Sequence, residues 1–535
     1  MPPYKYVPLG RARQQTVTTP LVAAPPASAR ALLPASVRAR FEAPVKRFVA
    51  SPQQAAIFQW VREGQGNAIV EAVAGAGKTT TLIQLLELLE GNVFFGAYNV
   101  KAKDEILTRA REAGADRRGL KISTVHSAGL YDFRRAFPNV EISDNKSHAL
   151  INALAHGHPE KDLIEQTRTF LQRMISYGKQ FLVGCAGRPA IDNKDLWSKL
   201  AEHFSADLEI IEPVTMDKAL TWLIDLFKRS LEQCPQVIDF DDMIYAPIAY
   251  NLKLFGNDWV LIDECQDINP ARRELAKRLL KRGGRAIFVG DSRQAIYGFT
   301  GAGADSVTRI VDEFNCTKLP LTVSYRCPQA VVRYAHQWVS HIEAHPDAPE
   351  GVVRPVIYNT NPTDGSPVKP WYMQDNVLAT DAVLCRYTRP LIELAYSMIK
   401  NGHACKVEGR DIGLGLIALA SKWKITRLDT LLERLSAYQT REVAKAIEQR
   451  STRRQQEIED KVGTLRVFIA RVNAQGKHTL ADLRSEIEKL FQDDVKNVTT
   501  LCTGHKSKGR EWSRVFWIRT MQRGGAMKEW EALQE

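Results

Sequence analysis

The sequence lacks the patterns that mark disulfide, zinc and membrane proteins. Its eight cysteines include no C-x-x-C pair, which argues against a structural zinc site and favours reduced thiols in a cytoplasmic setting. No apolar stretch approaches the length of a membrane span, and no repeat of fixed period is present. What remains is 535 residues that are 44% hydrophobic and 25% charged. This composition is typical of an ordinary globular protein of two to four domains.

Acidic residues are scarce in the first fifty positions. Residues 1–50 hold eight basic residues and one acidic residue, so they carry +7 of the chain's net charge of +12. Eight prolines in the same segment oppose a continuous amphipathic helix, which argues against an organellar transit peptide. We expect a disordered, basic, proline-rich arm over 1–50. Because the remaining chain is nearly neutral, its motifs must decide whether the partner is a nucleic acid.

Short apolar runs alternate with helical patterns in the first half of the chain. This alternation is typical of an α/β fold with parallel sheets covered on both faces. Residues 131–236 and 413–497 are mainly helical in pattern, whereas strand and helix signals alternate again over 311–412. The runs end in small or acidic residues and lie at 68–71, 93–96, 259–263 and 286–291.

A glycine-rich turn follows the first run. Such a turn lets backbone N–H groups surround phosphate oxygens at a helix N-terminus. Lys78 would reach the β- and γ-phosphates, and Thr79 would ligate Mg²⁺. ATP is the expected nucleotide, but the turn alone does not separate a kinase, a GTPase and a motor. Its residues are Ala72, Val73, Ala74, Gly75, Ala76, Gly77, Lys78, Thr79 and Thr80, with Ala72 where the usual pattern has glycine.

Two carboxylates follow the third run. A strand that ends in Asp263 and Glu264 can place Asp263 in the Mg²⁺ shell and leave Glu264 to polarise an attacking water. The fourth run leads into Gln294, an amide suited to sensing a γ-phosphate. Tyr297 and Phe299 follow and offer flat surfaces to unstacked bases, although ordinary core packing explains a single aromatic residue as well.

The order of these motifs resembles that of superfamily 1 DNA helicases of the UvrD/Rep type over roughly residues 50–518. The resemblance implies two RecA-like P-loop domains with inserted helical subdomains and with ATP in the cleft between the domains. Arg510 and Ser324 depart from the usual leucine and asparagine. The segments that carry the resemblance, besides the glycine-rich turn, are Tyr98-Asn99-Val100-Lys101-Ala102-Lys103-Asp104-Glu105, Thr124-Val125-His126-Ser127, Asp263-Glu264-Cys265-Gln266-Asp267, Ser324-Tyr325-Arg326-Cys327 and 503–512.

The same resemblance implies a role for individual residues. Gln54 would read the adenine, Tyr325 would stack on it, Arg326 would contact the γ-phosphate and Glu511 would hold the ribose. Gln266 would couple nucleotide to DNA. The residues expected to face DNA are Tyr98, Asn99, Thr124, His126, Tyr297, Phe299 and His505.

The resemblance also divides the chain. The first RecA-like domain would comprise 51–130 and 237–310, with 131–236 as its helical insertion. The second, C-terminally incomplete, would comprise 311–412 and 498–535, with 413–497 as its insertion.

The chain departs from the family after Trp512. Family members carry a V-A-x-T-R helix there, and residues 532–535 look like the acidic lead-in to it. Because an arginine finger is worth about 10³–10⁵ in rate in comparable sites, we expect a truncated product that binds ATP and DNA but turns over slowly.

Three functions stay open. The first is an ATP-dependent helicase or translocase that moves 3′ to 5′ on single-stranded DNA and at its junctions with duplex. The second is a nucleotide-binding DNA-binding subunit whose protein partner supplies the arginine. A P-loop kinase or small-molecule ATPase is disfavoured because it has no use for the glutamine, tyrosine-arginine and histidine motifs.

Two other charged segments invite more than one interpretation. The segment 238–244, I-D-F-D-D-M-I, is similar to one in phage-type and F-box-helicase-like members. Its three acids could suggest a metal nuclease, but we expect Asp239 to cap a helix and the others to pack or lie at the surface. Arg450, Arg453 and Arg454 lie at helical spacing, which fits a grip on duplex phosphates or, more commonly, a solvated helix face.

Overall fold

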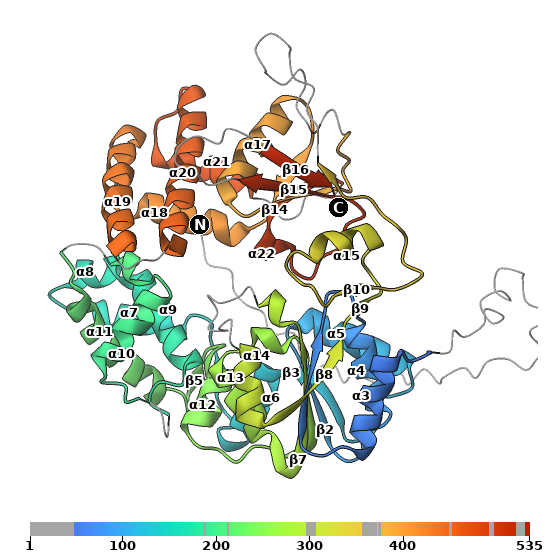
Figure 1. The fold of residues 1–535 in the computed structure, drawn as a ribbon. Coiled ribbons are helices and arrows are strands. Elements are labelled where there is room, and N and C mark those ends of the chain that lie inside the picture. The colour runs from blue at the N-terminus through green and yellow to red at the C-terminus, as the bar shows by residue number, and fades with distance from the viewer. Residues whose placement is uncertain are drawn as a thin grey trace, which may run out of the picture. The chain divides into compact units, whose positions relative to one another are not determined.

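The structure is a computed structural model that describes residues 48–185, 189–210, 213–295, 306–355, 372, 376–448, 452–491, 497–520 and 530–534. Residues from Gln53 onward form one compact unit, whose framework is two six-stranded sheets (Figure 1). The expected α/β fold class with parallel sheets is confirmed. Within the described residues, we find no helix with the length and apolar character that a membrane crossing needs.

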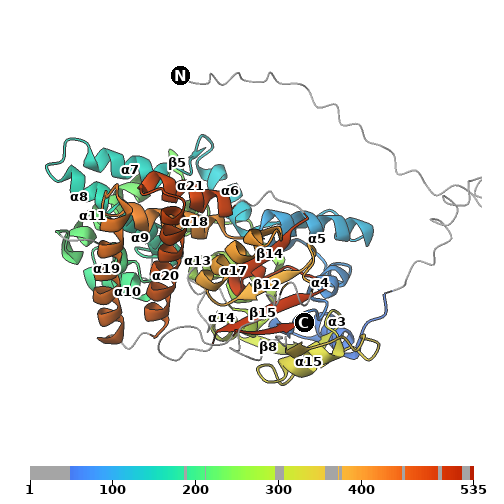
Figure 2. The same cartoon turned by 90° about the horizontal axis from the view of Figure 1, so that it is seen from above.

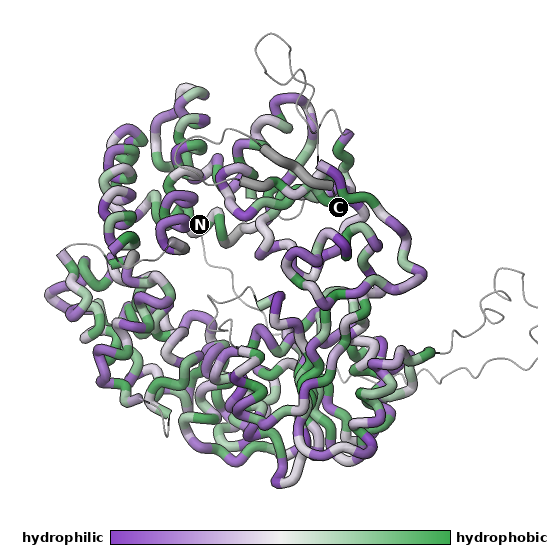
Figure 3. The backbone as a smooth tube through the Cα atoms, viewed as in Figure 1, coloured by the Kyte–Doolittle hydropathy of each residue, from purple (hydrophilic) through white to green (hydrophobic). Residues whose placement is uncertain are grey.

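The first sheet is parallel throughout, in the order β3-β2-β6-β7-β1-β8. Every residue of β2 is buried, as helices on both faces require. Hydrophobic residues concentrate along these strands in Figure 3. The strands are β1 (Asn67–Ala72), β2 (Val93–Ala97), β3 (Leu120–Thr124), β6 (Asn257–Ile262), β7 (Leu280–Gly290) and β8 (Cys316–Leu321).

The helices of this part follow the strands in the alternation that the sequence predicts. They are α3 (Pro52–Glu63), α4 (Lys78–Leu86), α5 (Val100–Glu112), α6 (Val125–Ala136), α12 (Asp242–Ala249), α13 (Pro270–Arg278) and α14 (Ser306–Phe314), with the 3-10 helices η2 (Cys265–Asp267) and η3 (Ser292–Gln294).

The first α/β part extends further along the chain than predicted. Strand β8 pairs with β1 over its whole length, and α14 packs against both strands. The division therefore falls after Leu321 rather than at residue 310. Strand β8 lies at the edge of the sheet, and only its last residue, Leu321, is buried. The sequence therefore shows no long apolar run that would predict this strand.

The first helical insertion is tied together at its two ends. Strand β4 (Glu141–Ile142) pairs with β5 (Val237–Ile238), so the chain leaves and returns at neighbouring points. The helices between them are α7 (Lys146–Ala155), α8 (Lys161–Gln166), α9 (Arg168–Gln180), α10 (Lys194–His203), η1 (Asp207–Glu209) and α11 (Met216–Glu232).

The second sheet has the order β11-β16-β15-β12-β14-β13. Residues 530–534 form a strand antiparallel to β15, so the expectation of a helix lead-in at 532–535 is wrong. Strands β12 to β15 pair in parallel, and α17 (Thr388–Lys400) and α22 (Gly504–Ser507) pack on them. The strands are β11 (Arg354–Pro355), β12 (Ala382–Cys385), β13 (Cys405–Val407), β14 (Thr499–Thr503), β15 (Val515–Thr520) and β16 (Trp530–Gln534).

A small unit joins the two sheets. Here β9 (Val323–Ser324) pairs with β10 (Glu343–Ala344), and α15 (Gln329–Ala335) lies between them in sequence.

The second helical insertion contains α18 (Arg410–Ser421), α19 (Leu428–Glu448), α20 (Thr452–Ala474) and α21 (Leu480–Leu490). Helices α19 and α20 lie side by side (Figure 2). Arg454 on α20 is 3% exposed and its Nη2 lies 2.7 Å from Asp207 Oδ2 of η1, so the expected solvated or DNA-gripping role is wrong for this arginine. Arg450 and the side chain of Arg453 lie outside the described residues.

Candidate nucleotide and nucleic-acid site

The glycine-rich turn connects β1 to α4. Gly75 and Gly77 have φ values of +71° and +77°, a conformation that favours glycine. Lys78 is the first residue of α4, followed by Thr79 and Thr80, so these side chains stand at the N-terminus of a helix. Free N–H groups there suit an anion. Ala72, where the usual pattern has glycine, ends β1 and is buried.

The carboxylates meet this turn at the end of β6. Lys78 Nζ lies 3.8 Å from Glu264 Oε1, and Glu264 adopts a left-handed φ of +51°, which is costly for a residue with a side chain. Burial and the adjacent Glu264 carboxylate raise the pKa of Asp263 to about 7, against the effect of Lys78. A buried carboxylate and a partly exposed one beside a single lysine form a site that favours an added cation.

A chain of hydrogen bonds links Glu264 to Gln294. Gln266 Nε2 donates to Glu264 Oε2 at 2.6 Å, and Gln266 Oε1 accepts from the Asp291 N–H at 3.0 Å. Asp291 Oδ2 then accepts from Gln294 Nε2 at 2.8 Å. The three segments that the sequence singled out are thus joined by side-chain contacts.

Lys508 joins the second α/β part to the same chain of bonds. Its Nζ donates to Asp267 Oδ2 at 2.6 Å and to the Gln294 carbonyl at 2.7 Å. Burial raises the pKa of Asp267 to about 6, although Lys508 opposes the shift. Sequence reasoning missed this contact, because nothing local in the motif at 503–512 points to a partner 241 residues away.

The tyrosine-arginine pair lies against the glycine-rich turn. The Tyr325 N–H donates to the Gly75 carbonyl at 2.9 Å, and the Tyr325 ring is 48% exposed. Arg326 Nη2 lies 2.7 Å from Glu511 Oε1, with both side chains more than half exposed. Such an exposed pair is weak, so each partner remains available to a nucleotide.

Gln54 is buried at the base of the turn. Its Nε2 donates to Thr81 Oγ1 at 2.9 Å and lies 3.7 Å from the position that a Cβ on Gly77 would take. Gln54, which was predicted to read the adenine, is therefore held beside the glycine-rich turn by its hydrogen bond to Thr81.

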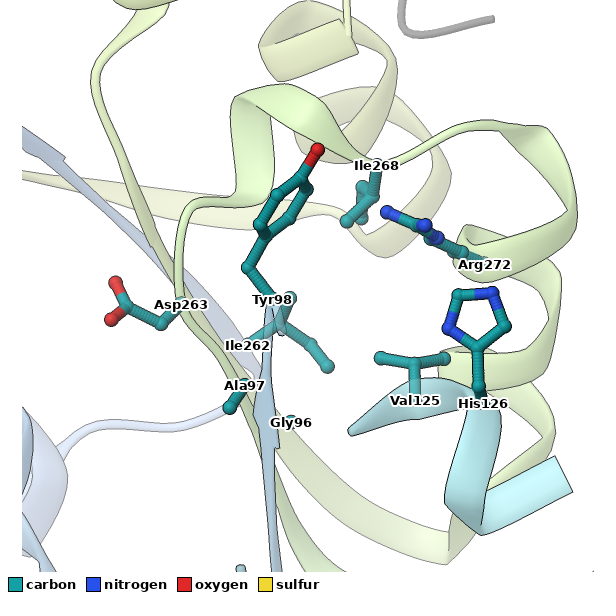
Figure 4. Close-up of a pocket in the computed structure, with 9 residues that line it drawn as sticks. All are labelled: Gly96, Ala97, Tyr98, Val125, His126, Ile262, Asp263, Ile268 and Arg272. Atoms are coloured by element: carbon teal, nitrogen blue, oxygen red, sulfur yellow. The ribbon is translucent and has the colours of Figure 1, made fainter. Parts of the chain in front are cut away.

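Four of the residues predicted to face DNA, Tyr98, Asn99, Thr124 and His126, lie at the ends of β2 and β3. Tyr98 and His126 line one pocket with Arg272 (Figure 4). Asn99 and Thr124 cap α5 and α6 by accepting bonds from Ala102 and Ser127. Burial and the nearby Arg272 lower the pKa of His126 to about 3, so its ring is neutral at physiological pH.

One exposed aromatic residue at this face was missed. Phe240 is 54% exposed and stacks on His126 with ring centroids 3.9 Å apart. An aromatic residue within a run of acids was the available signal. His505 lies elsewhere, on α22 of the second α/β part, and Tyr297 and Phe299 lie outside the described residues.

The acids around Phe240 are structural. Asp239 Oδ1 accepts from the Asp242 N–H at 2.9 Å, as the expected cap requires. Asp242 is fully buried and pairs with Lys146 at 2.7 Å and Lys179 at 2.9 Å. A carboxylate held by two buried lysines is neutralised, which removes any reason to assign a metal to it.

The parallel sheet, the glycine-rich turn and the paired carboxylates define a P-loop protein with two RecA-like α/β parts. Residues 52–315 match the family model described as "UvrD/REP helicase N-terminal domain". Over this region the chain is similar to the UvrD/Rep-type superfamily 1 helicases.

Named relatives carry similar sequences. The chain is 27% identical over 301 residues to the ATP-dependent DNA helicase Rep of Salmonella typhimurium, and the matched region covers 51% of this chain and 40% of the relative. The Escherichia coli Rep helicase is 28% identical, with 51% and 41% covered. The Staphylococcus epidermidis ATP-dependent DNA helicase PcrA is 24% identical over 298 residues, with 52% and 39% covered. The chain thus spans about two fifths of the length of these relatives.

Proposed function

We propose that the chain is an ATP-dependent DNA helicase or translocase that moves on single-stranded DNA, in the 3′ to 5′ direction. The hydrogen-bonded chain from Glu264 through Gln266 and Asp291 to Gln294 carries the proposal. It begins at the residue suited to activate water and ends at the residue suited to sense the γ-phosphate. A kinase or small-molecule ATPase has no use for Lys508, which ties the second α/β part to that chain.

The residues at the turn divide the chemistry between them. The backbone N–H groups at the start of α4 and the Lys78 ammonium hold phosphate oxygens. Glu264, bonded to Gln266 and close to Lys78, is positioned to accept a proton from the attacking water. Its left-handed backbone is a strain of the kind that is kept at functional sites.

The same residues fit a magnesium ion. Asp263 is a carboxylate whose pKa is raised by burial and then by the adjacent Glu264 carboxylate, and Thr79 offers a hydroxyl in the first turn of α4. Mg²⁺ is commonly held by one or two side chains together with phosphates and water. The ion would neutralise charge that develops on the phosphates.

The face that carries Tyr98, His126 and Phe240 would hold the strand. Stacking of a base on an aromatic side chain is worth about 1–3 kcal/mol and tolerates any sequence. Opening and closing of contacts such as the Lys508 bridge would then alternate between nucleotide states and move the strand.

Steady-state ATP hydrolysis with and without oligo(dT) tests the proposal. We expect hydrolysis that rises with single-stranded DNA and disappears in Lys78→Ala. Hydrolysis that ignores DNA would favour a small-molecule ATPase. DNA binding without hydrolysis, restored by a second protein, would favour the DNA-binding subunit. Displacement of streptavidin from either end of a biotinylated strand tests the direction of movement.

A further inference from the structure

Arg272 is held among the aromatic residues of the proposed strand-binding face. It lies in the first turn of α13, where the Arg272 N–H donates to Asn269 Oδ1 at 3.0 Å. Its guanidinium carbon lies 5.5 Å from the centroid of the Tyr98 ring. Figure 4 shows the Arg272 side chain pointing toward Tyr98, with the His126 ring beside it and Asp263 pointing away.

The bonding capacity of Arg272 is not used up. Its Nε is buried and has no hydrogen-bond partner among the described residues. The Arg272 guanidinium hydrogen-bonds the Tyr98 side chain, and no ion pair within the described part of the chain includes it. An arginine keeps its charge at any pH in which a protein folds, and a buried donor without an acceptor is costly. The geometry therefore calls for an acceptor that a ligand brings, and for an anionic one.

We propose that Arg272 binds a phosphate oxygen of the single strand whose bases stack at Tyr98 and Phe240. The inference rests on the proposed function and adds a strand contact that the motifs did not indicate. The planar guanidinium suits phosphate oxygens. Arg272 lies five residues after Asp267, whose carboxylate accepts a hydrogen bond from Lys508. A phosphate bound at Arg272 would therefore be connected through one short segment to the residues around the proposed nucleotide site.

Salt dependence of strand binding tests this contact in the full chain. A fluorescent dT oligonucleotide is titrated at several KCl concentrations between about 50 and 300 mM, because each phosphate contact contributes about 0.7 to the slope of log K against log salt for a single strand. Arg272→Gln is expected to lower that slope by about 0.7 and the affinity at 100 mM KCl by about tenfold or more. Lys277→Gln, which removes an exposed charge from the same helix, should leave both within about twofold of wild type.

Arg272→Lys separates charge from geometry and guards against misfolding. It keeps the charge but not the Nε–H group, so we expect the wild-type slope with reduced affinity. Binding of a fluorescent ATP analogue should be unchanged in all three variants.

The outcomes are distinguishable. Wild-type slope and affinity in Arg272→Gln would overturn the inference and leave the proposed function standing. Failure of the wild-type chain to bind the oligonucleotide would overturn both. If Arg272→Gln does not fold, a lowered slope in a folded Arg272→Lys would overturn the inference.

Discussion

Replacing Gly75 with alanine should loosen the contact between the glycine-rich turn and the tyrosine-arginine segment. A Cβ at position 75 would lie 2.5 Å from Arg326 Cβ and 2.8 Å from Ser324 Oγ, at a φ of +71°. The left-handed backbone costs alanine about 1–2 kcal/mol, and overpacking typically adds about 1–3 kcal/mol. The expected loss of stability is therefore about 2–5 kcal/mol.

Gly114→Ala is the matched control. Gly114 has a φ of +74°, and no atom lies within 4 Å of the position that a Cβ would take there, so only the backbone cost of about 1–2 kcal/mol applies. Urea unfolding followed by circular dichroism compares the two variants. Gly75→Ala should also weaken binding of a fluorescent ATP analogue by about fivefold, since the bond from the Tyr325 N–H to the Gly75 carbonyl is worth about 1 kcal/mol. Equal stability and equal ATP affinity in the two variants would refute the reasoning.

Three further substitutions test other parts of the site. Glu264→Gln should keep ATP binding and lower the hydrolysis rate by about 10²–10⁴-fold, as loss of a general base does; a hydrolysis assay beside nucleotide titration checks it. Phe240→Ala should weaken oligonucleotide binding by about 1–3 kcal/mol with unchanged ATP affinity, measured by fluorescence anisotropy. Because the folded pKa of Asp267 is raised to about 6 from 3.8, the unfolded chain releases this proton first. The free energy of unfolding of the wild-type chain, relative to that of Asp267→Asn, should therefore fall as the pH rises from about 4 to 6. Urea unfolding measures this difference, and a difference that does not change with pH would show that the Asp267 pKa is not raised.

Features with a local cause were predictable from the sequence. The turn at Gly75 and Gly77, the strand ending in Asp263 and the capping role of Asp239 each depend on residues a few positions apart. The alternation of apolar runs and helical patterns was likewise enough for the α/β class.

Features that depend on distant partners were not predictable. Arg454 looked like a surface residue because its partner Asp207 lies 247 positions away. The acids near Phe240 gave no sign of Lys146 and Lys179, which come from the helical insertion. Strand β8 was assigned to the wrong part because its pairing with β1 is visible only in three dimensions.

We propose that Gln266 couples the nucleotide site to a bound strand. The direct test is the affinity of the wild-type chain and of Gln266→Ala for oligo(dT), each with and without a non-hydrolysable ATP analogue. We expect the analogue to change wild-type affinity by about 5- to 150-fold, as coupled sites typically do, and to leave the affinity of Gln266→Ala unchanged. A wild-type affinity that does not respond to the analogue, or a full response in Gln266→Ala, would contradict the account.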